Sequence, residues 1–169
     1  NTLKMQKKIK YLDPSIERKK NLTNKNFQLI KNSKFPLPSE VEISESGVCN
    51  RKCSFCPRSA PDFKEVKEFI SPSLHSKLIN DLEKEDYKGV IRYSGFVEPM
   101  LDKNIYNLIS ETKEKLQFSR IEIVTNGDVL NIPRLKRLFK SGLSTLLISV
   151  YDGPEDAKKF EKMCKDANL

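Results

Sequence analysis

The sequence has little of what a membrane or secreted protein needs. No run of about 18 apolar residues is present to span a membrane, and no apolar stretch follows a basic N-terminus as in a secretory signal. Histidine occurs once, as His75, and cysteine four times in 169 residues. With 37% hydrophobic residues, the chain is too apolar to be wholly disordered. These features predict one globular core and a cytoplasmic location.

The cysteines are too few and too unevenly spaced for a disulfide scaffold. Cys49, Cys53 and Cys56 lie within eight positions, and Cys164 stands far away. A small secreted domain that is stapled by disulfides distributes an even set of cysteines along its length. The clustering therefore favours a metal ion or a metal cluster in a reducing compartment.

The excess positive charge is confined to one end of the chain. The formal net charge is +8, residues 1–34 hold ten Lys or Arg against two acidic residues, and residues 35–169 are neutral. We therefore expect a basic arm, residues 1–40, ahead of a core domain, residues 41–169. The arm could be a solvated tail, could dock an acidic electron donor such as flavodoxin or ferredoxin, or could bind RNA. Nucleic acid is the least favoured partner, because aromatic residues are sparse and the domain itself is neutral.

Strand-like and helix-like segments alternate after residue 40. Apolar or alternating stretches predict strands at 41–44, 89–93, 121–124 and 146–150. The last of these is apolar enough to be buried on both faces. Between the first two, Leu74, Leu78 and Leu82 repeat every four residues and predict one apolar helix face. Four βα units in succession predict an α/β fold with a parallel sheet.

A polar motif follows each predicted strand. The three clustered cysteines follow the first strand. The motifs after the second, third and fourth strands are Ser94–Glu98, Thr125–Gly127 and Ser149–Asp152. Because reactive groups of parallel α/β sheets lie at the carboxyl ends of the strands, we expect these motifs to share one rim of the sheet.

The strongest motif is the C-x3-C-x2-C loop formed by Cys49, Cys53 and Cys56. Thiolates are the usual ligands of iron–sulfur clusters, and a short loop can wrap three corners of a cubane. Three cysteines leave the fourth iron without a protein ligand, so that iron is open to a substrate or a cofactor.

A structural zinc site is the alternative, with His75 or Cys164 as the fourth ligand. The chain would then be a non-catalytic zinc- or iron–sulfur-binding interaction module. His75 falls inside a predicted helix, where we expect an exposed side chain, and Cys164 is expected to pack in the last helix.

With these motifs, residues 41–169 resemble the radical S-adenosylmethionine (radical SAM) superfamily. Its members carry C-x3-C-x-aromatic-C after the first strand, and Phe55 stands at the aromatic position. The resemblance implies that Cys49, Cys53 and Cys56 hold a 4Fe–4S cluster. It also implies that S-adenosylmethionine chelates the remaining iron, with Phe55 beside the adenine.

The resemblance implies further cofactor contacts. Gly95 and Glu98 belong to a segment similar to the family's Gly-Gly-Glu-Pro, which contacts the methionyl amino group, although Val97 stands where glycine is common. Polar residues where relatives reach the cofactor's carboxylate or ribose are Asn126, Ser149 and Asp152.

The implied activity is reductive cleavage of S-adenosylmethionine to a 5′-deoxyadenosyl radical, which removes a hydrogen atom from a substrate. Relatives act on peptides, sugars or aminocyclitols, so we expect a small-molecule or peptide substrate, and no side chain that reacts with it is identifiable. Some relatives carry an auxiliary-cluster (SPASM or twitch-like) C-terminal domain. The resemblance also implies a partial (β/α) barrel, with about four βα units of the family's six, and hence a fragment.

Overall fold

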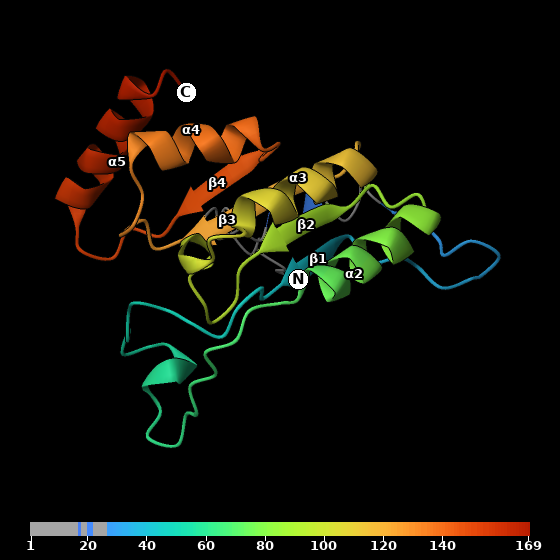
Figure 1. Ribbon diagram of the computed structural model, residues 1–169, viewed down its shortest axis with the longest axis horizontal. Coiled ribbons are helices and arrows are strands. Elements are labelled where there is room, and N and C mark those ends of the chain that lie inside the picture. The colour runs from blue at the N-terminus through green and yellow to red at the C-terminus, as the bar shows by residue number, and fades with distance from the viewer. Residues whose placement is uncertain (1–16, 18–19, 22–26) are drawn as a thin grey trace, which may run out of the picture.

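The chain forms a parallel sheet, seen in a computed structural model that describes residues 17, 20–21 and 27–169 (Figure 1). Within these residues, four strands pair in the order in which they occur along the chain, and every pair is parallel. The strands are β1 (Glu40–Ile43), β2 (Val90–Tyr93), β3 (Arg120–Thr125) and β4 (Thr145–Ile148).

A helix follows each strand, and the helices follow one another across the sheet in the same order (Figure 1). They are α2 (Pro72–Lys84), α3 (Ile105–Lys115), α4 (Ile132–Lys140) and α5 (Pro154–Asp166), with short 3₁₀ turns η1 (Pro57–Ser59) and η2 (Pro99–Leu101). Polar caps begin two of them. Ser71 Oγ accepts from the Leu74 N–H (3.2 Å), and Asn131 Oδ1 accepts from the Arg134 N–H (2.9 Å). Both bonds satisfy N–H groups that have no partner inside the helix.

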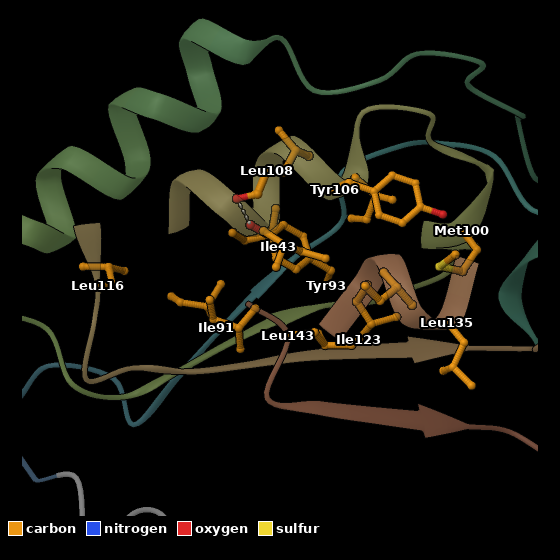
Figure 2. Close-up of a cluster of buried hydrophobic side chains, with 14 of the residues drawn as sticks. Ile43, Ile91, Tyr93, Met100, Tyr106, Leu108, Leu116, Ile123, Leu135 and Leu143 are labelled. Atoms are coloured by element: carbon orange, nitrogen blue, oxygen red, sulfur yellow. Dashed lines mark hydrogen bonds between the residues drawn. The ribbon is translucent and has the colours of Figure 1, made fainter. Parts of the chain in front are cut away.

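The hydrophobic core lies between the two central strands and the helices (Figure 2). Alternate residues of β2 and β3 supply one side of it, and α3 and α4 supply much of the other. The fully buried members include Ile91, Tyr93, Ile121, Ile123, Ile105, Leu108, Leu135 and Leu138. The apolar residues of β2 and β3 alternate with Arg92 and Glu122, which are also buried. A slip by one residue would turn these charged side chains toward the helices, so this alternation fixes the register.

The α/β prediction, with four βα units and a partial (β/α) barrel, is confirmed. One detail is wrong: every residue of β4 is half-buried rather than buried on both faces. Within the described residues β4 has a partner only on its β3 side, so the apolar run belongs to an edge strand.

Two expectations about α2 are also wrong: that its leucines form the buried face, and that His75 is exposed. Its fully buried residues are His75 and Ile79, whereas Leu74 is exposed. Leu78 and Leu82 pack against the core as partly buried residues. The buried face of α2 is therefore rotated from the one that the leucines predict.

The predicted basic arm is described only in part. Residues 27–37 form a turn in which Leu29 pairs with Pro36. The Gln28 side chain holds this turn to the α2–β2 loop, donating to the Asp86 carbonyl and accepting from the Lys88 N–H. Most of the arm's basic residues lie outside the described part of the chain, so the arm and its boundary at residue 40 remain a prediction. No described helix is long and apolar enough to cross a bilayer.

Candidate active site

A cavity of about 200 Å³ opens at the carboxyl ends of the strands. Eight of the nine residues that the sequence singled out line it: Cys49, Cys53, Cys56, Phe55, Gly95, Glu98, Asn126 and Ser149. The ninth, Asp152, is not among its lining residues. Segments up to 100 positions apart thus meet at one rim because the strands are parallel and their carboxyl ends coincide.

The three cysteines are half-buried free thiols on the loop after β1. A backbone turn brings the last two together, since the Cys56 N–H donates to the Cys53 carbonyl at 2.9 Å. In the described part of the chain, no three His, Cys, Asp or Glu side chains are arranged to hold a single metal ion. A cluster makes a different demand, because each of its thiolates binds a separate iron. Three thiols that line one cavity, with no fourth beside them, fit a 4Fe–4S cluster with one open iron.

Glu98 ties the cysteine loop to the ends of β2 and β3. Its carboxylate is buried and accepts from the Met100 N–H (3.0 Å), Thr125 Oγ1 (2.6 Å) and the Asn126 N–H (2.7 Å). Its own N–H donates to the Val48 carbonyl at 2.8 Å. A carboxylate has about four acceptor sites, so one remains for a donor in the cavity.

The segment before Glu98 turns at Gly95, where φ is 127°. Val97 has no positive φ. The substitution of valine for the family's usual glycine therefore places no strain on this backbone, since the left-handed conformation that favours glycine falls two residues earlier.

Asn126 is joined to the cysteine loop by a side-chain ring. Its Nδ2 donates to Asn50 Oδ1 (2.8 Å), Asn50 Nδ2 donates to Asp128 Oδ2 (2.8 Å), and the Asp128 N–H donates back to Asn126 Oδ1 (2.9 Å). The ring fixes the orientation of the Asn126 amide beside the cavity.

Arg51 lies between two carboxylates on neighbouring strand ends. Its guanidinium donates to Asp128 (2.5 and 2.7 Å) and to Asp152 (2.6 and 3.1 Å). The hydrogen bonds from Arg51 hold the pKa of both carboxyls below the usual aspartate range. Asp152 is thus placed as a partner of Arg51 instead of a cavity-lining group. The clamp joins groups 77 and 101 positions apart, and no local pattern in the sequence signals it.

Two aromatic rings stand at the mouth of the cavity. The Phe55 ring is 74% exposed, and its centroid lies 5.7 Å from that of Tyr151. The Arg51 guanidinium lies 5.2 Å from the Tyr151 centroid. Ser149 directly follows β4 and lies two residues before Tyr151. Its N–H donates to the Thr125 carbonyl at 2.9 Å. These rings provide an apolar face against which a flat ligand could stack.

Neither of the two candidates for a fourth zinc ligand is available to the cysteine loop. His75 is fully buried, with Nδ1 2.8 Å from Glu111 Oε2 and Nε2 2.8 Å from Tyr93 Oη, so both ring nitrogens are occupied. The expectation that His75 is exposed is therefore wrong. Cys164 packs against the hydrophobic core from α5.

Comparison with known proteins points to one family. A model of the radical SAM superfamily matches residues 43–168. The S-adenosyl-L-methionine-dependent 2-deoxy-scyllo-inosamine dehydrogenase of Niallia circulans is 33% identical over 115 residues, which are 68% of this chain and 46% of that protein. A GTP 3′,8-cyclase of Clostridium acetobutylicum is 33% identical over 130 residues, which are 76% of this chain and 38% of that protein.

The fold comparison agrees. A crystal structure of BtrN in complex with AdoMet and 2-DOIA superposes with a TM-score of 0.68 at 29% identity, covering 76% of this chain and 51% of that one. This chain therefore spans about half the length of these relatives or less. Radical SAM proteins use a 4Fe–4S cluster and S-adenosylmethionine, in agreement with the cofactors that the sequence predicts. The family model covers well over half of the chain, and the chain belongs to the radical SAM superfamily.

Proposed function

We propose that the chain is part of a radical SAM enzyme whose cluster is bound by Cys49, Cys53 and Cys56. The observation that carries the proposal is the convergence of these thiols with five further predicted residues on one cavity. A structural metal site would not need an open cavity beside its ligands. When bound, the two cofactors supply the one-electron chemistry that generates a hydrogen-abstracting radical.

The chain's own residues would bind and orient S-adenosylmethionine. Glu98 has an acceptor site left for the methionyl amino group, and its remaining contacts keep that oxygen in place. Phe55 offers an exposed ring to the adenine. Within the described residues, the Ser149 hydroxyl makes no hydrogen bond in competition with a ribose or carboxylate contact. Asn126 is the second polar side chain that would contact the ribose or carboxylate, and Asn50 accepts a hydrogen bond from its amide.

Asp152 has a different proposed role. Both of its carboxylate oxygens accept hydrogen bonds from Arg51. We therefore assign Asp152 to the support of the cysteine loop rather than to direct contact with the cofactor.

For the substrate, we favour a sugar or an aminocyclitol over a peptide. The support is similarity alone: one relative is a 2-deoxy-scyllo-inosamine dehydrogenase, and BtrN has been crystallised with 2-DOIA. A cytoplasmic location and a flavodoxin or ferredoxin as electron donor complete the proposal.

Anaerobic reconstitution with iron and sulfide tests the proposal. The reduced protein should show a cluster EPR signal that changes when S-adenosylmethionine is added, and should release 5′-deoxyadenosine detectable by chromatography. Cys53→Ala should lower 5′-deoxyadenosine formation at least 100-fold, because one iron loses its thiolate.

Cys164→Ala is the matched control, since this cysteine lies in α5 away from the cavity. It should leave the EPR response and the product yield within twofold of wild type. An unaltered, cofactor-responsive cluster in Cys53→Ala would contradict the assignment.

A further inference from the structure

Arg58 is a buried cation beside the candidate cluster site. It lies in η1, two residues after Cys56, lines the same cavity and is only 6% exposed. Burying a guanidinium costs free energy unless its N–H groups find acceptors. Lys52, in the same loop, has a side chain that is 75% exposed and avoids this cost.

The acceptors that Arg58 has in the structure account for only its terminal nitrogens. Nη1 donates to the carbonyls of Gly47 (2.8 Å) and Phe96 (3.2 Å), and Nη2 donates to Glu65 Oε1 at 3.3 Å. The Nε–H is buried, and within the described residues it has no acceptor. Glu65 is exposed and also lies 3.9 Å from Lys52 Nζ, so it compensates the buried charge only in part.

Glu98 is the acidic side chain that lines this cavity, and its oxygens accept hydrogen bonds from Met100, Thr125 and Asn126. The proposed function assigns its one remaining acceptor site to the methionyl amino group, so that site is not available to Arg58. The groups of the same cavity that become anionic acceptors when a cluster binds are the thiolates and the sulfides that they hold.

We propose that the Nε–H of Arg58 donates a hydrogen bond to a sulfur of the bound cluster, and that its charge stabilises the reduced state. This inference rests on the proposed function. Hydrogen bonds to sulfur and nearby positive charge raise the reduction potential of an iron–sulfur cluster. Arg58 is thus a positioning residue that tunes the reduction potential of the cluster through its Nε–H, the one group without an acceptor among the described residues.

The test is an EPR-monitored redox titration of the reconstituted protein without S-adenosylmethionine. Arg58→Gln should lower the equilibrium constant for cluster reduction at least tenfold, which is about 59 mV for a one-electron couple. Arg58→Lys retains the charge and should recover part of that loss. Lys52→Gln, the exposed cation of the same loop, should change the constant less than twofold.

Glu65→Gln provides a second test with the opposite sign, and it decides the matter if Arg58→Gln fails to retain a cluster. Removal of this carboxylate leaves Arg58 less compensated, so the equilibrium constant for reduction should rise at least threefold. A wild-type cluster that does not respond to S-adenosylmethionine would count against the proposed function itself. A responsive cluster whose potential is unchanged in both variants, or shifts only with S-adenosylmethionine present, would overturn the role of Arg58.

Discussion

At the residue scale, Glu45 is the clearest case of a side chain whose chemistry depends on burial. It follows β1 and is fully buried. Its Oε1 accepts from Ser46 Oγ at 3.2 Å, while Oε2 has no partner among the described residues. Burial raises the pKa of Glu45 to about 8, and the nearby carboxylates of Asp102 and Glu98 add to the effect. The folded protein therefore holds Glu45 as a neutral acid at pH 7.

This protonation predicts that stability falls as pH rises. Between the unfolded pKa of about 4.3 and the folded value, the folded state binds a proton that the unfolded state does not. Glu45 then lowers the free energy of unfolding by up to about 1.4 kcal/mol per pH unit. Glu45→Gln, which cannot ionise, should flatten this dependence. Urea unfolding at pH 5.5, 6.5 and 7.5 measures it.

The control is Glu161→Gln, an exposed glutamate in α5. It should preserve the pH profile of the wild type. Parallel profiles for wild type and Glu45→Gln would contradict the assignment of a neutral buried acid.

The cysteines were predictable as a candidate site because all three lie in one short loop, where spacing alone indicates a metal cluster. Arg51, Arg58 and Glu45 were not. Each looks like an ordinary loop charge in the sequence, and its burial or pairing depends on segments that only folding brings near. The buried arginine and glutamate are recognisable from their unsatisfied polar atoms, which a sequence does not display.

At the scale of elements, a buried polar network joins α2 and α3 to β2. The Tyr93 hydroxyl lies 2.8 Å from His75 Nε2 and 2.7 Å from Thr112 Oγ1, and it donates to the Leu108 carbonyl at 3.2 Å (Figure 2 draws this last bond). All three side chains of the network are fully buried. From β2, the Tyr93 hydroxyl thus forms hydrogen bonds with polar groups on both α2 and α3.

Tyr93→Phe should lower the free energy of unfolding by about 1–3 kcal/mol, because buried partners on both helices lose a hydrogen bond. Tyr151→Phe is the matched control. Tyr151 is 42% exposed, so its change should stay within about 0.5 kcal/mol. Urea denaturation at one pH compares the two, and equal losses would show that the network adds no stability.

The helices were predictable in number and order, but the buried face of α2 was not. An α-helix turns 100° per residue, so leucines four residues apart drift by about 40° at each step. Leu74 and Leu82 therefore cannot both face the core squarely. The buried positions are His75 and Ile79, and a histidine gives no apolar signal from which this face could be read.

At the scale of the whole molecule, charge is divided along the chain. The net charge of +8 comes from residues 1–34, and the rest of the chain is neutral. Such an arm would raise the encounter rate with an acidic donor protein through long-range attraction. Salt screens that attraction beyond about 10 Å at 0.1 M ionic strength.

We therefore expect 5′-deoxyadenosine formation to fall about tenfold between low and high salt with flavodoxin as reductant. With dithionite, a small anion that needs no docked complex, the rate should change less than twofold. The measurement is the initial rate over a salt series with each reductant. An equal response to salt with both reductants would remove docking as the role of the arm.

The clamp of Arg51 between Asp128 and Asp152 has a consequence for how this scaffold can be altered. Loops after strands are the usual place to change specificity, because the sheet tolerates their variation. Here the loops after β3 and β4 each supply a carboxylate that holds the cysteine loop. An engineer who rebuilds either loop for a new substrate would also loosen the cysteine loop. Laboratory evolution of this protein should therefore recover loop variants that retain both aspartates far more often than chance.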